Sequence, residues 1–146
     1  MNVDLRRGFT MLETMVVVAI VAILAAVALP SYAGYVKRAH ILEAVARLSD
    51  AREQMETYFQ DARSYVDGSG ACGAAPPSPG TGDAFALTCT ATATTYLYTA
   101  TGLSTKGMDA FVFTVDQNGA RATVSVPGGW RRTADCWTIR ADGFCA

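Results

Sequence analysis

The chain has 146 residues, of which 51% are apolar, so it can fill the core of one ordinary globular domain. Its formal net charge is -1 and the charges are scattered, which excludes a basic nucleic-acid-binding tail and an acidic disordered block. The four cysteines are an even number and no two of them form C-x-x-C, so we expect disulfides in an exported domain rather than a metal or redox site.

The first predicted element is an apolar segment near the N-terminus. Residues 15–29 are all apolar, and only three residues interrupt the pattern between positions 9 and 29: Thr10, Glu13 and Thr14. As a helix, these 21 residues would be roughly 31 Å long, the thickness of a bilayer's hydrocarbon core. Arg6 and Arg7 directly precede the segment, and by the positive-inside rule they keep its start in the cytoplasm. The sequence therefore predicts a single membrane crossing with the rest of the chain outside.

Three interpretations fit this segment. It can be an ordinary secretory signal, cut near Ser31-Tyr32-Ala33, or a twin-arginine signal that uses Arg6 and Arg7. The third interpretation explains Glu13, because a carboxylate within hydrocarbon costs about 3 kcal/mol and normally has a partner. If the chain were cut after Gly8, the new α-amine of Phe9 would lie four residues from Glu13, in the same subunit or a neighbouring one.

The residues Gly8-Phe9-Thr10-Met11-Leu12-Glu13, the apolar run and the closing Ala28-Leu29-Pro30-Ser31-Tyr32 together resemble the class III leader and first helix of type IV pilins. The resemblance implies that a prepilin peptidase cuts after Gly8 and methylates Phe9, that Glu13 serves assembly, and that Pro30 is the kink point. Many relatives have glycine at the position of Ala22, and alanine is about 1 kcal/mol better in a helix. We therefore expect this helix to melt less readily during assembly.

The same resemblance implies where the chain resides and what it contacts. We expect a leader over residues 1–8, a transmembrane and assembly segment over 9–30, and a globular pilin domain over 31–146. The subunit would lie in the inner membrane as a single-pass protein and then join an extracellular pilus. Its partners would be other pilin subunits through the N-terminal helix, the prepilin peptidase and the inner-membrane assembly machinery.

After Pro30 the apolar residues become periodic. They recur at steps of three and four, which predicts an amphipathic helix continuing to Ala62, roughly 80 Å in all from Phe9. The members of this stripe are Ile41, Ala44, Val45, Leu48, Ala51, Met55, Tyr58 and Phe59. Two charge pairs at i,i+4 spacing, Glu43 with Arg47 and Arg52 with Glu56, are expected to lie on a solvated face of this helix and to give it minor support.

A loop and four strands are predicted next. Glycine, proline and serine dominate residues 67–83, which excludes a helix or a central strand there. Strand-like runs follow at 84–91, 94–100, 110–116 and 120–126, and Asn118-Gly119 indicates a tight hairpin turn between the last two. We expect an α+β fold in which a four-stranded antiparallel sheet packs on the helical stripe, as in pilins.

The tail contains Pro127-Gly128-Gly129-Trp130 and ends in a segment bounded by cysteines. This segment resembles the disulfide-bonded C-terminal loop of type IVa pilins, and the tail as a whole is most similar to minor pilins. Among three possible connectivities, we expect the two pairs that are local in sequence, Cys72 with Cys89 and Cys136 with Cys145. By the loop-entropy model each bridge would contribute about 3 kcal/mol.

We expect a minor pilin that acts in pilus assembly, adhesion or twitching motility, without enzymatic activity or a cofactor. The single histidine, His40, has no nucleophile or carboxylate placed to make it a general base. Two alternatives stay open: a type II secretion pseudopilin and a minor pilin that binds DNA for natural transformation. Residues for DNA contact would be Lys106, Arg121, Arg131, Arg132 and Arg140, with Trp130 and Trp137 for stacking.

The overall charge argues against strong DNA binding. Without Arg6, Arg7 and Asp4 of the leader, the 12 basic and 13 acidic residues fall to 10 and 12, a net charge of -2. From the sequence alone we expect binding weaker than about 10 μM at physiological salt.

Overall fold

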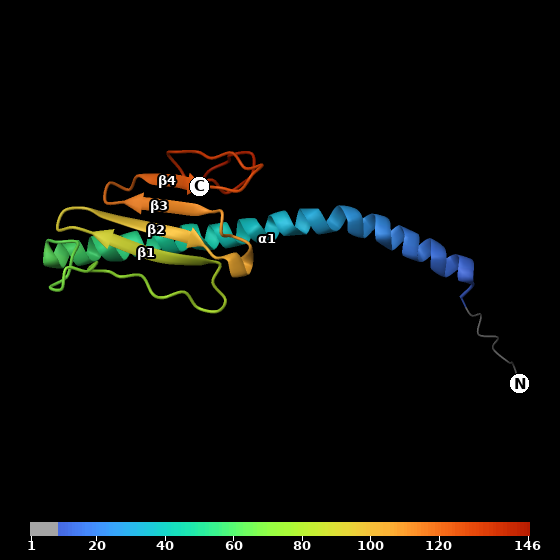
Figure 1. The fold of residues 1–146 in the computed structure, drawn as a ribbon, viewed down its shortest axis with the longest axis horizontal. Helices are drawn as coiled ribbons and strands as arrows, with labels where there is room; N and C mark the ends of the chain where they lie inside the picture. The colour runs from blue at the N-terminus through green and yellow to red at the C-terminus, as the bar shows by residue number, and fades with distance from the viewer. Residues whose placement is uncertain (1–8) are drawn as a thin grey trace, which may run out of the picture. The chain divides into compact units, whose positions relative to one another are not determined.

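The computed structural model describes residues 9–146, so the proposed leader and its cleavage residue Gly8 lie outside the described residues. One helix, α1 (Met11–Ala62), forms most of the first half of the chain and passes through Pro30, close to the predicted bounds (Figure 1). It ends at Ala62, and the next residue, Arg63, has a left-handed φ of 56° and an N–H that donates to the carbonyl of Phe59 at 2.8 Å. A left-handed residue at this position is a common way to stop a helix.

The chain divides into two units, one ending at Val36 and the other comprising Lys37–Ala146. In the first unit the large apolar side chains are exposed, with Phe9 80%, Leu12 75% and Val27 72% accessible. By its length and composition, α1 is long enough and apolar enough to cross a membrane. Taken by itself, the first unit therefore leaves a long apolar helical surface uncovered among its described residues.

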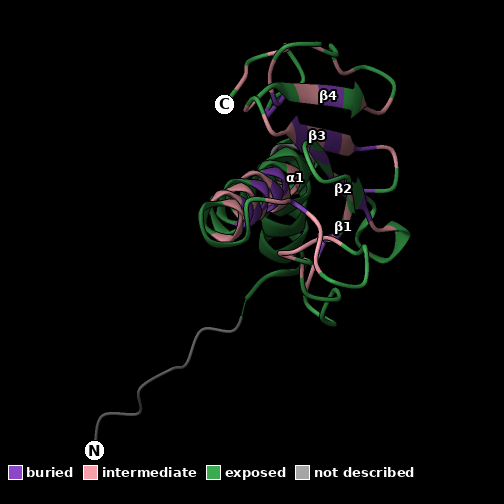
Figure 2. Cartoon of the chain, turned by 90° about the vertical axis from the view of Figure 1, so that its left-hand side faces the viewer, coloured by how far each residue is buried: buried purple, intermediate pink, exposed green. Residues whose placement is uncertain are grey.

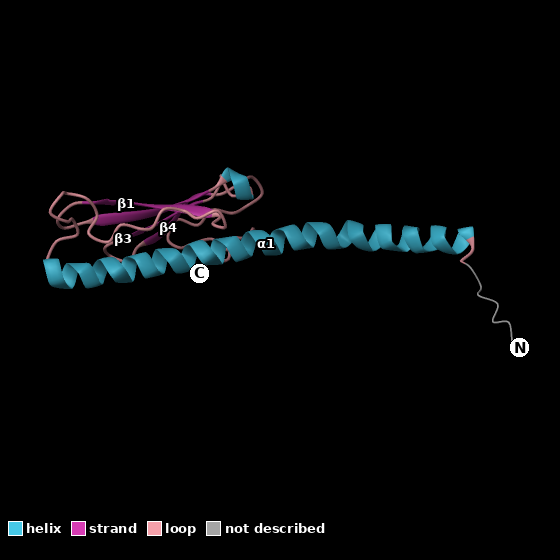
Figure 3. Cartoon of the chain, turned by 90° about the horizontal axis from the view of Figure 1, so that it is seen from below, coloured by secondary structure: helices cyan, strands magenta, loops and turns pink. Residues whose placement is uncertain are grey.

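The second unit is a two-layer α+β fold. Its four strands form one antiparallel sheet in the order β1-β2-β3-β4. The strands are β1 (Phe85–Ala91), β2 (Tyr96–Gly102), β3 (Val112–Asp116) and β4 (Arg121–Ser125), and a short 3-10 helix, η1 (Ser104–Lys106), lies between β2 and β3. Figure 3 shows the sheet running alongside the C-terminal part of α1. This is the predicted fold class.

The core lies between α1 and the sheet, because each contributes one apolar face. The predicted helical stripe is confirmed: Ile41, Leu48 and Met55 are completely buried, and Figure 2 shows the buried residues gathered where α1 faces the strands. The sheet contributes alternate residues of each strand, as expected when one face is covered. The strand residues of this core are Phe85, Leu87, Tyr96, Tyr98, Ala100, Phe113 and Val115.

Two turns set the strand bounds. β2 begins at Tyr96 rather than Thr94, because the Oγ1 of Thr92 accepts the N–H groups of Thr94 and Thr95 and closes a turn. The predicted β3–β4 hairpin is present, but only Gly119 has a positive φ, at 72°. The N–H of Asp116 donates to Ala120 O at 3.2 Å, so three residues, 117–119, lie inside this last pair, and the N–H of Gly119 donates to Asp116 O at 3.0 Å. The loop is thus a turn followed by a left-handed glycine.

The predicted i,i+4 charge pairs are wrong. Arg47 pairs with Asp83 at 3.0 Å rather than with Glu43, and it also donates to the carbonyl of Phe85. Glu56 instead accepts the hydroxyls of Tyr65 and Tyr96 at 3.3 and 2.9 Å. Both side chains are used to join α1 to segments far away in the sequence. Helical spacing alone cannot reveal such partners.

The segment between α1 and β1 is held at several points. The disulfide Cys72–Cys89 joins it to β1, and the hydroxyl of Tyr98 donates to the carbonyl of Ala74. Burial raises the pKa of Tyr98 to about 12, so this donor keeps its proton. Asp83 fixes the other end of the segment through Arg47 and through the N–H of Gly80.

Candidate functional site

The first candidate site is the start of α1, where the structure places Phe9 and Glu13. The Oγ1 of Thr10 accepts the N–H of Glu13 at 3.2 Å, so Thr10 caps the helix and Glu13 lies in its first turn. Thr10-x-x-Glu13 is the spacing of a capping box, a signal that was present in the sequence but not used in the prediction. The helix dipole favours a carboxylate in the first turn. Glu13 is exposed, as is Phe9.

His40 occupies the region just after the apolar segment, as expected from the sequence. Its Nδ1 lies 3.9 Å from a carboxylate oxygen of Glu43, one turn along α1, and the side chain is 25% exposed. This is a loose surface pair of little energetic value. His40 is therefore a half-buried residue of the helix surface.

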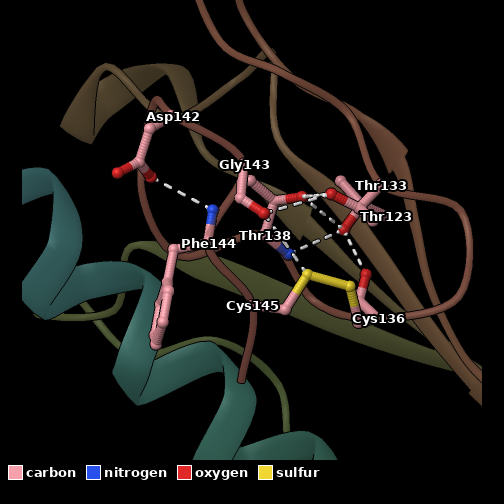
Figure 4. Close-up of a disulfide and its surroundings, with 8 residues drawn as sticks. All are labelled: Thr123, Thr133, Cys136, Thr138, Asp142, Gly143, Phe144 and Cys145. Atoms are coloured by element: carbon pink, nitrogen blue, oxygen red, sulfur yellow. Dashed lines mark hydrogen bonds between the residues drawn. A yellow bond between two sulfur atoms is a disulfide. The ribbon is translucent and has the colours of Figure 1, made fainter.

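The second candidate site is the C-terminal loop, residues 127–146, which closes on itself and on β4. The predicted disulfide Cys136–Cys145 is confirmed, together with Cys72–Cys89. Beside the bridge, the Oγ1 of Thr123 donates to the carbonyl of Cys136 at 2.6 Å and accepts the N–H of Thr138 at 2.8 Å (Figure 4). Thr123 and Thr138 are both buried. Thr123 belongs to β4, so its hydroxyl fixes the loop to the sheet.

Backbone hydrogen bonds make the loop a defined structure. The N–H of Arg131 donates to Ala141 O at 3.0 Å, that of Ile139 to Phe144 O at 2.8 Å, and that of Ala146 to Trp137 O at 2.9 Å. The segments before Cys136 and after Cys145 are thus each joined to the segment between the two cysteines. Side chains carried by this loop are consequently presented in fixed positions.

Three of the four arginines proposed for DNA contact, Arg131, Arg132 and Arg140, are exposed on this loop. Arg140 pairs with Asp142 at 3.2 Å, and its guanidinium lies 5.5 Å from the centre of the Phe144 ring. Arg132 donates to the carbonyl of Val124 at 3.3 Å. Each guanidinium is still accessible, so the loop can contact an anion.

The other two basic residues differ in their surroundings. Arg121 lies at the start of β4, and its guanidinium is 4.7 Å from the centre of the Trp137 ring, so it is tied to the loop by a cation–π contact. Lys106 lies in η1, in the connection between β2 and β3, and is exposed.

The predicted stacking role of Trp137 is wrong. This side chain is only 1% exposed, and its indole N–H donates to the carbonyl of Thr114 at 2.8 Å. Trp130 is half-buried with its edge against Phe111, the ring centres being 4.9 Å apart. The exposed aromatic residue of the loop is Phe144, at 56%. Its place beside the last cysteine was the only sequence signal that pointed to it.

Comparison with known families decides which proteins these two sites belong to. A family model described as "Type IV minor pilin ComP, DNA uptake sequence receptor" matches residues 30–110, more than half of the chain. The chain belongs to this family of type IV minor pilins. A second model, the prokaryotic N-terminal methylation motif, matches residues 4–29 of this minor pilin and includes Gly8, Phe9 and Glu13.

Individual relatives agree with the family. The minor pilin is 41% identical over 63 residues to a fimbrial protein of Moraxella nonliquefaciens, and 40% identical over 75 residues to the type IV major pilin protein PilE1 of Neisseria gonorrhoeae. These alignments cover 43% and 51% of this chain but only 41% and 46% of the relatives. The chain thus spans less than half of the length of these relatives.

A solved structure supports the fold. The non-core minor pilin PilV of Neisseria meningitidis superposes with a TM-score of 0.51 at 16% identity, covering 65% of this chain and 97% of that one. At this identity the similarity shows the pilin fold and nothing more specific.

Proposed function

We propose that this minor pilin is a structural subunit of a type IV pilus, anchored by α1 in the inner membrane before assembly and held by the same helix in the filament afterwards. The observation that carries the proposal is the exposed apolar surface of residues 9–28, which the first unit by itself leaves uncovered among its described residues. In water, exposing such a surface costs about 25 cal/mol per Å². Lipid before assembly and the helices of other pilins after it would both provide cover.

Maturation follows from the junction between Gly8 and Phe9. The methylation motif over residues 4–29 supports a cut after Gly8 by a prepilin peptidase and methylation of Phe9. Mass spectrometry of the protein from sheared filaments of its native host should show loss of residues 1–8 and one added methyl group. A mature chain that starts near Gly34 would instead establish cleavage by an ordinary signal peptidase.

Glu13 has a proposed role in assembly. Its carboxylate lies in the first turn of α1, where the amine of a mature Phe9 would join it, either in the same subunit or in a neighbour. Replacing Glu13 by valine removes an intramembrane charge, so Glu13→Val should accumulate in the membrane yet be depleted from filaments. The matched control is Thr14→Val, which removes a nearby polar group without charge. Equal incorporation of both variants would contradict the pairing.

Capture of DNA is the second candidate function, and it runs against the weak binding that the net charge of the chain predicts. The matching family is described as a DNA uptake sequence receptor, and the C-terminal loop exposes Arg131, Arg132 and Arg140. The family match favours a pilus subunit over the type II secretion alternative. Adhesion and twitching motility stay predictions from the sequence resemblance.

Salt dependence tests DNA capture. Fluorescence anisotropy of a labelled duplex would be measured with the full chain in detergent micelles across a series of salt concentrations. Affinity falls with salt, and each lost phosphate contact should make the slope of log affinity against log salt less steep by about 0.9. Changing Arg131, Arg132 and Arg140 to alanine should therefore reduce the magnitude of this slope by roughly 2–3. A wild-type affinity weaker than about 10 μM at physiological salt would exclude a receptor role for the chain by itself.

A further inference from the structure

The side chain of Phe144 is an exposed aromatic ring on a fixed backbone. The backbone N–H of Phe144 donates to Asp142 Oδ1 at 3.1 Å, and its backbone carbonyl accepts the N–H of Ile139 at 2.8 Å. The next residue, Cys145, is in a disulfide. Figure 4 shows the ring directed away from the disulfide and from the threonines beside it. A ring presented in this way loses little conformational entropy when it binds a partner.

One cationic side chain lies next to this ring, and a second packs on the residue before it. The guanidinium of Arg140 is 5.5 Å from the ring centre. The aliphatic part of Arg131 packs on Gly143, the residue before Phe144, so closely that a Cβ on that glycine would lie 2.9 Å from Arg131 Cδ. Gly143 also has a φ of +91°, a backbone conformation that residues other than glycine rarely adopt. The loop therefore needs glycine at position 143 so that Arg131 can pack on its backbone.

The acidic residue in this patch does not block it. Asp142 and Arg140 are 59% and 48% exposed, and an ion pair this accessible is worth little in water. A phosphate approaching Arg140 can replace the carboxylate as its partner, because a guanidinium has five donors.

We propose that Phe144 makes the apolar base contact of the DNA site, its ring lying against the face of a base while Arg131 and Arg140 bind the phosphates on either side. The proposal rests on the DNA-binding function above and adds to it a residue that contacts bases. An aromatic face flanked by cations is the combination that binds an unstacked base, and the same ring can press into a base step of a duplex.

The experiment compares Phe144 variants with a matched control elsewhere on the domain. Leu97 of β2 is the control, because it is also an exposed apolar residue, at 41%, on another part of the same unit. The full chain in detergent micelles would be titrated into a fluorescently labelled single strand and, separately, into the corresponding duplex. Non-reducing peptide mapping would verify both disulfides in every variant.

Phe144→Ala should weaken binding by about 5- to 100-fold with little change in the salt slope, because a stacking contact releases no counterions. Phe144→Trp should bind at least as well as the wild type, whereas Phe144→Leu, which keeps the apolar volume but not the aromatic face, should lose most of the affinity. Leu97→Ala should bind like the wild type. Loss on the single strand alone would assign the ring to an unpaired base, and loss on the duplex as well would assign it to a base step.

The outcomes separate this proposal from the one on which it depends. If the wild type binds neither nucleic acid, DNA capture itself is wrong. If the wild type binds and Phe144→Ala binds as tightly as Leu97→Ala, DNA capture stands and the role of Phe144 is overturned. Equal affinities of Phe144→Leu and the wild type would likewise exclude stacking.

Discussion

Gly102, at the end of β2, has no space for a side chain. It is buried and pairs with Phe85, and its N–H donates to the carbonyl of Phe111 at 2.9 Å. A Cβ at this position would overlap the backbone carbonyl of Met108. Unlike the end of a flexible side chain, a backbone carbonyl cannot turn away, so the strand or the β2–β3 connection must shift.

Gly102→Ala should therefore destabilise the domain by about 1–3 kcal/mol, the usual cost of overpacking, or more. Chemical denaturation of the full chain in detergent would measure this. Gly68→Ala is the matched control, since Gly68 is exposed and a Cβ there meets no atom within 4 Å. Similar denaturation midpoints for the two variants would show that the connection is more adaptable than its packing indicates.

Thr123 acts at the same scale, because one hydroxyl joins β4 to the C-terminal loop. Thr123→Val keeps the shape but leaves the N–H of Thr138 and the carbonyl of Cys136 without this partner. Each buried polar group left unpaired costs about 1–3 kcal/mol. We expect faster hydrogen exchange at Thr138 in Thr123→Val. Thr123→Ser, which retains the hydroxyl, should keep the exchange slow.

At the scale of an element, the loop that follows α1 contains a pH-sensitive carboxylate. Asp67 Oδ1 accepts the hydroxyl of Ser69 at 2.7 Å and the N–H groups of Ser69 and Ala71 at 2.8 and 3.0 Å. These hydrogen bonds, that of the Ser69 hydroxyl first, lower the pKa of Asp67 below its ordinary value of 3.8. A carboxyl whose pKa is lowered by folding stabilises the folded loop when the pH is above the pKa of the unfolded chain. This stabilisation is lost as the pH falls through the lower pKa of the folded loop.

Protection of the Ser69 and Ala71 amides should therefore be constant at neutral and mildly acidic pH and fall below about pH 4. Hydrogen exchange, corrected for its intrinsic pH dependence, would measure this. In Asp67→Asn the amide oxygen can still accept but carries no charge, so protection should be weaker and independent of pH over the same range. A wild-type loop with constant protection down to pH 2 would contradict the assignment.

At the scale of the whole molecule, each disulfide controls a different region. Cys72–Cys89 joins the segment after α1 to β1 across 17 residues, and Cys136–Cys145 closes the C-terminal loop across 9. Removing either pair by double serine substitution should cost about 2–4 kcal/mol, and slightly more for the longer loop. Loss of Cys136–Cys145 should increase exchange in residues 127–146 while α1 stays protected.

Loss of Cys72–Cys89 should instead increase exchange in residues 63–83, and the two variants serve as controls for each other. Peptide-level exchange that changes equally across the whole domain in both variants would show a single cooperative unit and contradict this division.

The sequence by itself determined the features that depend on neighbouring residues. Fifteen consecutive apolar residues require a nonpolar environment whatever the rest of the chain does, and steps of three and four place Ile41, Leu48 and Met55 on one face of α1. Alternation and turn residues likewise located the four strands to within about two residues. Both disulfides join cysteines that are close in sequence, so choosing the sequence-local pairs was sufficient to predict them.

Only the tertiary structure decided which side chains meet and which remain exposed. Trp137 is buried against β3 whereas Phe144 is exposed, although both are aromatic residues of the same loop. Arg47 binds Asp83, 36 positions away, and not Glu43 one turn along its own helix. Burial and pairing depend on segments that folding brings together from distant parts of the chain. For that reason the arginines of the candidate DNA site could be predicted from their residue type, but the aromatic residue beside them could not.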